Sequence, residues 1–252
     1  MIGPRGLTAL DGYGLLVEGF AHRQLMSMTS YNPEFYPALI EGCGFQKEVD
    51  FVSYTLDRGT FVMPEAVKRA GARAERELRI LRFDSRRALV RAARQIRETY
   101  NAAFVNNWEY YPLSRREVDF LVDQVRPLAD PRLMTFIASS EGLVGFLLAF
   151  PDVSAALQRM HGRLTPWGVA RLLLERRRTG SVALNGAGII PKYQGKGGNA
   201  LLYLQIEHAI RESHFDTAEL PQVAETATRM RRDLTTLGAR PVKTHRVYTR
   251  SL

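Results

Sequence analysis

A glycine-rich hexapeptide carries the clearest chemistry in this chain. Residues 194–199, QGKGGN, stand between an apolar stretch at 181–190 and a run with helical spacing at 200–210. Glycine lets backbone N–H groups point to one side without a Cβ in the way. The first turn of a helix adds unpaired N–H groups and the positive end of its dipole. Such a turn suits an anion, above all a pyrophosphate, and the alternative is a tight turn that only connects two elements.

The stretch before the turn is the element that must position it. Ser181 to Ile190 is β-branched and small-apolar, which predicts a buried strand. Gly186 and Gly188 predict a bulge or splay within the strand, and Pro191 ends it because proline cannot donate to a ladder. The local order is therefore strand, glycine-rich turn, helix.

The turn belongs to neither of the two commonest phosphate-binding patterns. It lacks the Lys-Ser/Thr ending of a P-loop and the glycine spacing of a dinucleotide-binding turn. It resembles instead the coenzyme A loop of the Gcn5-related N-acetyltransferase (GNAT) superfamily, Q/R-x-x-G-x-G/A after a hydrophobic strand, a proline and an aromatic residue. Asn199 departs from this pattern, since glycine or alanine is usual there. The residues that fit, in order, are Ile189, Ile190, Pro191, Tyr193, Gln194, Gly195, Lys196 and Gly197.

The resemblance implies an enzyme that uses acetyl-CoA or another acyl-CoA and no metal. In the superfamily the loop holds the pyrophosphate, and the pantetheine arm pairs like an extra strand against the splayed strand. The acceptor amine attacks the thioester directly, and a backbone N–H, here near Ile189, stabilises the oxyanion. The residues expected to bind coenzyme A are Gly188, Ile189, Ile190, Gln194, Gly195, Lys196, Gly197, Gly198 and Asn199.

The usual catalytic tyrosine of the superfamily is missing. It stands four residues before a Gly-Phe pair in the last helix, and Leu234 occupies that position before Gly238-Ala239. Glu225, at the end of the preceding strand, is the best candidate for a general base, with capping of the helix N-terminus as the alternative. On the last strand, Tyr248 and His245 are the remaining titratable candidates, with a surface or core position as the alternative. We take Glu225 and Tyr248 as the catalytic candidates.

A loop rich in aromatic residues is the predicted acceptor site. Residues 103–112 join two predicted helices that flank the acceptor cleft in the GNAT fold, and they include Phe104, Trp108 and Tyr110. Such side chains suit a bulky or apolar acceptor or acyl chain, the alternative being packing against the core. An insertion at 152–180 would cover this cleft as a lid. The expected acceptor is an amine of a small molecule or an amino acid.

The periodicities from Leu78 onward predict a mixed α/β fold. They give strand, two helices, hairpin, insertion, strand, loop, helix, strand, helix and strand, with a capping box at Ser114 and Glu117. This is also the element order of the GNAT fold. We therefore predict a GNAT-like acyltransferase domain over 78–252.

The residues before this domain form two further segments. Residues 1–57 resemble the end of a GNAT lobe, because Asn32, Tyr36 and Gly44-Phe45 stand in the order of its last helix and precede a strand. The chain would then begin late within that lobe or keep a structural remnant of it. The alternative is a helix-strand appendage that pairs with the main sheet. Residues 58–77 are predicted to be a linker, which could be helical.

Composition indicates a globular protein. The chain has 252 residues, of which 45% are hydrophobic and 24% charged. No apolar run approaches the roughly 18 residues that span a bilayer, so we expect a cytoplasmic protein without a membrane span. The single cysteine, Cys43, excludes an intramolecular disulfide, and we expect its side chain to be buried.

The net charge of +9 suits an anionic ligand, nucleic acid or a solvated surface. Arginine runs such as 176–178 lack interleaved aromatics, which favours solvated helix faces, and nucleic acid is not an expected partner. A homodimer is the candidate assembly. The alternative to an enzyme is a catalytically inactive GNAT-like module that binds coenzyme A or a protein partner, and the missing tyrosine favours this alternative.

Overall fold

The computed structural model describes residues 1–6, 11–25, 29–161, 163 and 165–251. The chain divides into two compact units, the first made of Met1–Asp57, Pro151–Ala183 and Thr217–Leu252, the second of Arg58–Phe150 and Leu184–Asp216. Residues 1–57 lie in the first unit, and residues 78–252 contribute to both.

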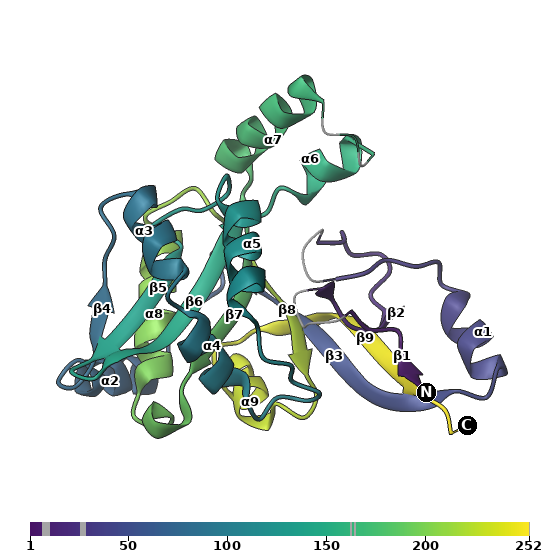
Figure 1. Ribbon diagram of the computed structural model, residues 1–252, viewed down its shortest axis with the longest axis horizontal. Helices are drawn as coiled ribbons and strands as arrows, with labels where there is room; N and C mark the ends of the chain where they lie inside the picture. Colours follow the sequence, from purple (N-terminus) through teal and green to yellow (C-terminus); the bar gives the residue numbers. More distant parts are fainter. Residues whose placement is uncertain (7–10, 26–28, 162, 164, 252) are drawn as a thin grey trace. The chain divides into compact units, whose positions relative to one another are not determined.

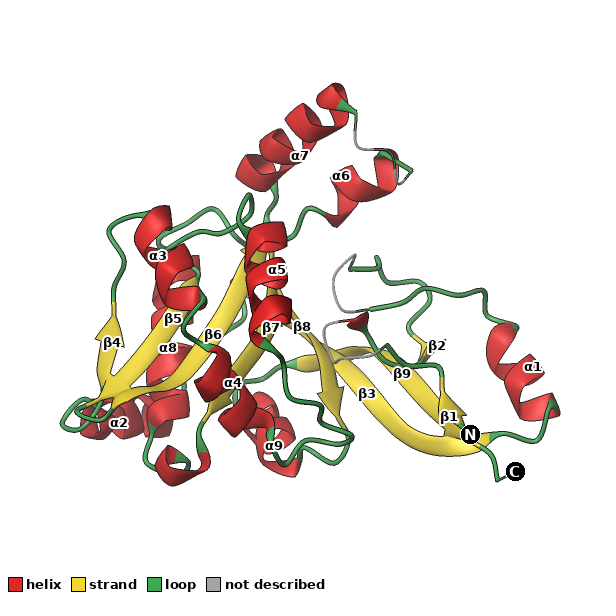
Figure 2. Cartoon of the chain, viewed as in Figure 1, coloured by secondary structure: helices red, strands yellow, loops and turns green. Residues whose placement is uncertain are grey.

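The second unit is a sheet with helices on both faces (Figures 1 and 2). The strand order is β7-β6-β5-β4, and β5 is antiparallel to both β4 and β6. Its core includes the fully buried side chains of Phe136, Ile137 and Phe146. The elements are α2 (Glu65–Ala74), β4 (Arg79–Leu81), α3 (Arg86–Ala93), α4 (Arg97–Phe104), α5 (Arg115–Val125), β5 (Met134–Ser139), β6 (Gly142–Pro151), β7 (Ser181–Ile189), a 3₁₀ turn (Pro191–Tyr193) and α8 (Gly198–Arg211).

Local hydrogen bonds explain where α5 begins and where α3 ends. The capping box predicted for α5 is confirmed, because the Ser114 side chain accepts from the Glu117 N–H while the Glu117 carboxylate accepts from the Ser114 N–H. The residues after Asp84 have a helical period, and the structure divides them between α3 and α4. The i→i−3 bonds from the N–H groups of Gln95 and Ile96 tighten and end α3.

The first unit is built around β3. Its strand order is β1-β9-β3-β8-β7, β2 also pairs with β9, and β3 is antiparallel to both β8 and β9. The first three residues of β7 run parallel to β8, with Ser181 beside Thr217. Residues 1–57 thus share a unit with the end of the chain, whereas the sequence predicts them as a separate lobe. The elements are β1 (Ile2–Gly3), β2 (Leu15–Glu18), α1 (Tyr36–Gly42), β3 (Gln46–Asp57), α6 (Ser154–Arg159), α7 (Pro166–Arg178), β8 (Thr217–Ala224), α9 (Thr228–Thr236) and β9 (Arg240–Thr249).

Two residues of the N-terminal segment differ from their predicted roles. Asn32 does not cap α1, which begins at Tyr36; its buried amide accepts from the Leu16 N–H (2.7 Å) and donates to the Leu16 carbonyl (3.1 Å), so it holds β2 in place. The prediction that Cys43 is buried is wrong, because the thiol is exposed just after α1. No residue of α1 is buried, so this helix does not pack against apolar surface that could cover the Cys43 thiol.

Candidate active site

The predicted glycine-rich turn joins β7 to α8. After the 3₁₀ turn the chain passes through Gln194 and Gly195, and α8 begins at Gly198 with Gly197 as its N-cap. Gly195 (φ +75°) and Gly197 (φ +83°) both adopt the left-handed conformation, which glycine reaches without strain from a Cβ. The glycines therefore set the path by which the chain leaves the strand and enters the helix.

Hydrogen-bond donors gather at this turn. Within the described ranges, the N–H groups of residues 195–198 have no backbone carbonyl acceptor. The side-chain amide of Gln194 donates to the Ile189 carbonyl (3.0 Å), which fastens the turn to the end of β7. Lys196 is exposed, with its ammonium 5.0 Å from the centre of the Tyr193 ring. Free N–H groups, a helix N-terminus and a cation together form a favourable environment for phosphate oxygens.

Helix α2 packs close to the turn, and this contact is a second reason for glycine at position 197. A Cβ on Gly197 would lie 2.7 Å from the Ala70 carbonyl oxygen and 3.1 Å from the Ala74 Cβ. A Cβ on Gly198 would lie 2.6 Å from Cδ1 of Ile189. α2 falls within the segment predicted as a linker, so the sequence did not reveal this contact.

An aromatic cluster covers Gly188, one residue before the end of β7. A Cβ on Gly188 would lie 2.9 Å from the Ala103 Cβ and 3.1 Å from Cζ of Phe146. The rings of Phe104 and Tyr100 contact Phe146, with centroid distances of 5.8 and 5.7 Å. Phe104 is predicted to bind the acceptor. It contacts Phe146, which lies beside Gly188, where the pantetheine arm is predicted to pair.

Comparison with solved structures identifies the architecture. A Gcn5-related N-acetyltransferase from Sphaerobacter thermophilus superposes with a TM-score of 0.52 at 17% identity, covering 84% of this chain and 54% of the other. The chain has a GNAT-like fold. The predicted mixed α/β class is thus confirmed, although three helices, α3 to α5, stand between β4 and β5 where two were predicted.

Sequence comparison finds two distant curated relatives of this GNAT-like chain. Protein YghO of Escherichia coli is 27% identical over 99% of the chain, and a bacterial ceramide synthase of Caulobacter vibrioides is 26% identical over all of it. The chain spans about two thirds of each relative, 65% and 66% of their lengths. No family model matches the chain.

The other predicted acceptor residues lie after α4 of the GNAT-like fold. The Tyr110 hydroxyl donates to the Asn101 side-chain oxygen (2.6 Å), and the Leu113 N–H donates to the same oxygen (3.0 Å). Burial raises the pKa of Tyr110. This bond holds the loop against α4, while Trp108 is half-buried beside it. The Tyr110 hydroxyl is therefore engaged in a structural hydrogen bond, besides the predicted role of Tyr110 in binding the acceptor.

The general-base candidate Glu225 follows β8 in the first unit and is held by β3. Its carboxylate accepts from the Lys47 ammonium (2.7 Å) and from the Asp50 N–H (3.1 Å). The hydrogen bond to Glu225 is the main reason that the pKa of Lys47 is raised. The N-cap of α9 is Ala227, so Glu225 links two strands instead of capping that helix.

The two candidates on β9 are both buried in the first unit. Tyr248 is 1% exposed, its hydroxyl donates to Glu41 (3.1 Å), and burial followed by this carboxylate raises its pKa to about 12. His245 is fully buried with Nε2 3.0 Å from the Ser30 carbonyl oxygen, and burial lowers its pKa. Leu234, which stands where the superfamily tyrosine is usual, is fully buried as well.

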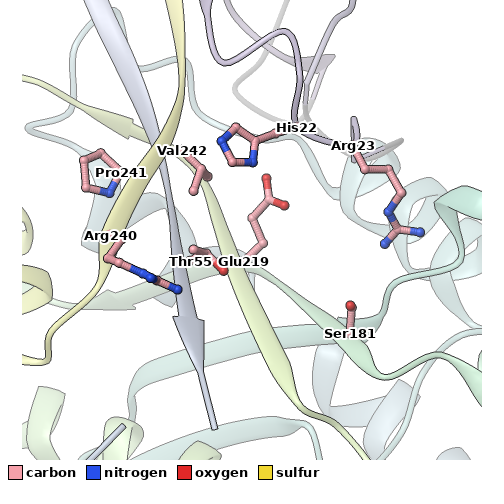
Figure 3. A pocket seen from close by; sticks show the side chains of 8 residues that line it. All are labelled: His22, Arg23, Thr55, Ser181, Glu219, Arg240, Pro241 and Val242. Carbon is pink, nitrogen blue, oxygen red and sulfur yellow. The ribbon is translucent and has the colours of Figure 1, made fainter. Parts of the chain in front are cut away.

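A polar pocket of about 470 Å³ in the first unit has no counterpart in the sequence predictions (Figure 3). Glu219 from β8 reaches into it, with the guanidinium groups of Arg23 and Arg240 on either side. The Lys243 ammonium, fully buried, lies 2.5 Å from the Glu219 carboxylate and donates to the Arg23 carbonyl (2.9 Å). The cations of β9, Arg240, Lys243 and Arg246, recur every third residue and not every second, so the sequence carried no signal for a polar pocket on one face of this strand.

Neither a metal site nor a membrane-spanning helix is found in the part of the chain that the structure describes. Among the described residues, no three His, Cys, Asp or Glu side chains converge as a metal site requires. No described helix combines the length and the hydropathy needed to cross a bilayer.

Proposed function

We propose that this protein is an acyl-CoA-dependent N-acyltransferase, acting with acetyl-CoA or a longer acyl-CoA. The observation that carries the proposal is the turn at Gly195 and Gly197, where left-handed glycines precede α8 and, among the described residues, no backbone carbonyl accepts a well-aligned hydrogen bond from the N–H groups of residues 195–198. The GNAT-like fold supports it, because the same turn holds coenzyme A in that superfamily. The backbone of the turn binds the pyrophosphate, and Gly188 to Ile190 pair with the pantetheine arm.

The reaction forms an amide directly. The acceptor nitrogen attacks the thioester carbon, the C–N bond forms, the C–S bond breaks, and the thiolate leaves with a proton. The Ile190 N–H donates to the Val144 carbonyl (3.0 Å), and successive N–H groups of a strand point to opposite edges. We therefore assign the oxyanion to the N–H of Ile189, which points to the other edge of β7.

For the acceptor we propose a long-chain amine. One relative is a bacterial ceramide synthase, and a ceramide is the amide of a fatty acid with a long-chain amino alcohol. Ala103 and the buried ring of Phe146 fill the space directly beside Gly188. An apolar chain would therefore lie along the half-buried rings of Tyr100 and Phe104. The general proposal of N-acyl transfer also allows a small amino acid as the acceptor, but such an acceptor would contact less of this aromatic cluster.

Proton transfer is assigned to Glu225 as base and Tyr248 as acid. The Tyr248 hydroxyl is protonated at neutral pH, as a proton donor must be, but burial and Glu41 raise its pKa to about 12, which makes it a weaker acid than an ordinary tyrosine. The contacts of both groups favour a second candidate function, a coenzyme A-binding module without turnover. Glu225 is bonded to Lys47 and the Asp50 N–H, and Tyr248 is buried against Glu41.

The first test is thermal unfolding with and without acyl-CoA. A ligand at 100 times its Kd adds about 2.7 kcal/mol to the stability of the folded state. The blocking variant is Gly195→Trp, and its matched control is Gly238→Trp. Both glycines are exposed, both have φ of +75°, and a Cβ on either meets no atom within 4 Å. The backbone strain is therefore the same, and only the Gly195→Trp variant should lose the shift.

The second test is turnover, measured as release of free thiol. Acetyl-CoA and palmitoyl-CoA are each supplied with sphinganine or with glycine as the amine. Thiol release with sphinganine supports the long-chain acceptor, and release with glycine alone contradicts it. Binding without release under all four conditions supports the inactive module. A wild-type protein that shifts with neither acyl-CoA contradicts both functions.

A further inference from the structure

Helix α7 presents an apolar face that no other described element covers closely. Trp167 is 81% exposed, and Leu173 and Leu174 are each 45% exposed. With Ala170 they recur at intervals of three and four residues, so they share one side of the helix. Contiguous exposed apolar side chains on a folded domain mark an interaction surface.

The opposite side of α7 packs against α6, which lies beside it in Figure 1. A Cβ on Gly168 would lie 2.8 Å from Cε of Met160, at the end of α6. Glu175 forms an ion pair with Arg159 of α6 (3.6 Å). The spacing of Gly168 and Glu175 puts them on the side away from Leu173, so packing within the α6-α7 pair leaves the apolar face outward.

The charge of α7 indicates what covers this face. The helix carries four arginines and one acidic residue, and that acid is the Glu175 already paired with α6. Arg171, Arg177 and Arg178 are exposed along the margin and the C-terminal end of the apolar face. A tryptophan and leucines flanked by arginines have the composition of an interfacial helix, whose apolar side enters a bilayer surface while the guanidinium groups reach phosphate.

We propose that α7 docks this protein on the surface of a bilayer that contains anionic phospholipid. Trp167, Ala170, Leu173 and Leu174 enter the acyl boundary, and Arg171, Arg177 and Arg178 bind lipid phosphates. A second copy of the chain is a poorer occupant. Two copies paired through this face would enclose the exposed arginines of α7 with no carboxylate from either helix to pair them, because Glu175 is bonded to Arg159. Such docking goes beyond the proposed acyl transfer. It would bring the protein to the membrane surface in which a lipid-like acceptor resides.

The experiment is co-sedimentation of the full chain with vesicles. Phosphatidylcholine vesicles with and without phosphatidylglycerol are compared, in low and high salt. We expect binding that requires phosphatidylglycerol and weakens as salt rises. Arg177→Gln with Arg178→Gln should weaken the partition about thirtyfold, since each basic residue near an anionic surface contributes about fivefold. Trp167→Ser should weaken it about tenfold or more.

Matched controls separate the helix from the rest of the surface. Arg87→Gln with Arg91→Gln removes two exposed arginines from α3, and Phe120→Ser removes an aromatic side chain that is 62% exposed on α5. Both controls should bind as the wild type does. Gly195→Trp should bind vesicles normally while losing the shift with acyl-CoA, so failure of docking and failure of the proposed activity are told apart.

Three results would overturn the docking proposal. The first is no sedimentation with phosphatidylglycerol vesicles, and the second is sedimentation that the α7 variants leave unchanged. The third is a stable dimer in solution that Trp167→Ser converts to monomer, which would assign the face to self-association.

Discussion

Substituting alanine at Gly197 separates two reasons for a glycine in this turn. The resemblance to the coenzyme A loop assigns Gly197 to close approach by a phosphate, whereas the structure shows α2 occupying the space of a Cβ. Alanine in the left-handed conformation at φ +83° costs about 1–2 kcal/mol. The methyl group would also lie 2.7 Å from a backbone oxygen, at Ala70, and relieving that overlap costs about a further 1–3 kcal/mol.

The matched control is Gly195→Ala, which carries the conformational cost alone. Its φ is +75° and its Cβ would meet no atom within 4 Å. For a chain of this length, 1 kcal/mol moves Tm by about 2–4 °C. Thermal unfolding followed by circular dichroism should therefore place the Tm of the Gly197→Ala protein about 2–12 °C below that of Gly195→Ala. Equal Tm values, together with acyl-CoA affinity lost only in Gly197→Ala, would refute the packing argument.

Three further predictions concern buried groups of the first unit. Glu219→Gln leaves the fully buried Lys243 ammonium without its carboxylate and should lower the unfolding free energy by about 3 kcal/mol in urea titrations; adding Lys243→Met should restore part of the loss. Because burial lowers the pKa of His245 in the folded protein, the unfolded chain binds more protons once the pH falls below about 6.5, and stability should decrease by up to about 1.4 kcal/mol per pH unit. His245→Asn should flatten that part of a Tm profile between pH 7.5 and 5.5, and an unchanged profile would contradict the burial argument. Tyr248→Phe removes the bond to Glu41, costing about 1 kcal/mol of stability, and should lower kcat about a hundredfold or more if the hydroxyl is the proton donor; unchanged thiol release would exclude that role.

The elements were largely predictable because their signals are local. The predicted strand at 217–224 is β8, and the capping box at Ser114 marks the start of α5. The pairing of β3 between β8 and β9 was not predictable, because no local pattern records which strands far apart in the chain become neighbours. The separate N-terminal lobe inferred for residues 1–57 rested on motif order, and motif order carries no information on strand pairing.

The same distinction holds at the candidate site. The turn at Gly195 and Gly197 could be predicted because glycine at these positions has a conformational cause that is visible in the sequence. The contact of Gly197 with Ala70 could not, because α2 contributes only a backbone carbonyl and small alanine side chains to it. Helical periodicity shows which side of α2 is apolar, but no local pattern records which turn that side packs against.

Glu225 illustrates why a catalytic residue is harder to predict than a binding turn. Its position after β8 was the basis for choosing it as a base, and that position is what the structure shows. A base also needs a free lone pair, which depends on partners that the position does not specify. Lys47 and the Asp50 N–H come from β3, far away in the sequence, and both donate to the Glu225 carboxylate. These donors take two of the roughly four acceptor positions of the carboxylate. Proton transfer from an amine would have to use one of the others, and their direction is set by β3 and not by the residues next to Glu225 in the sequence.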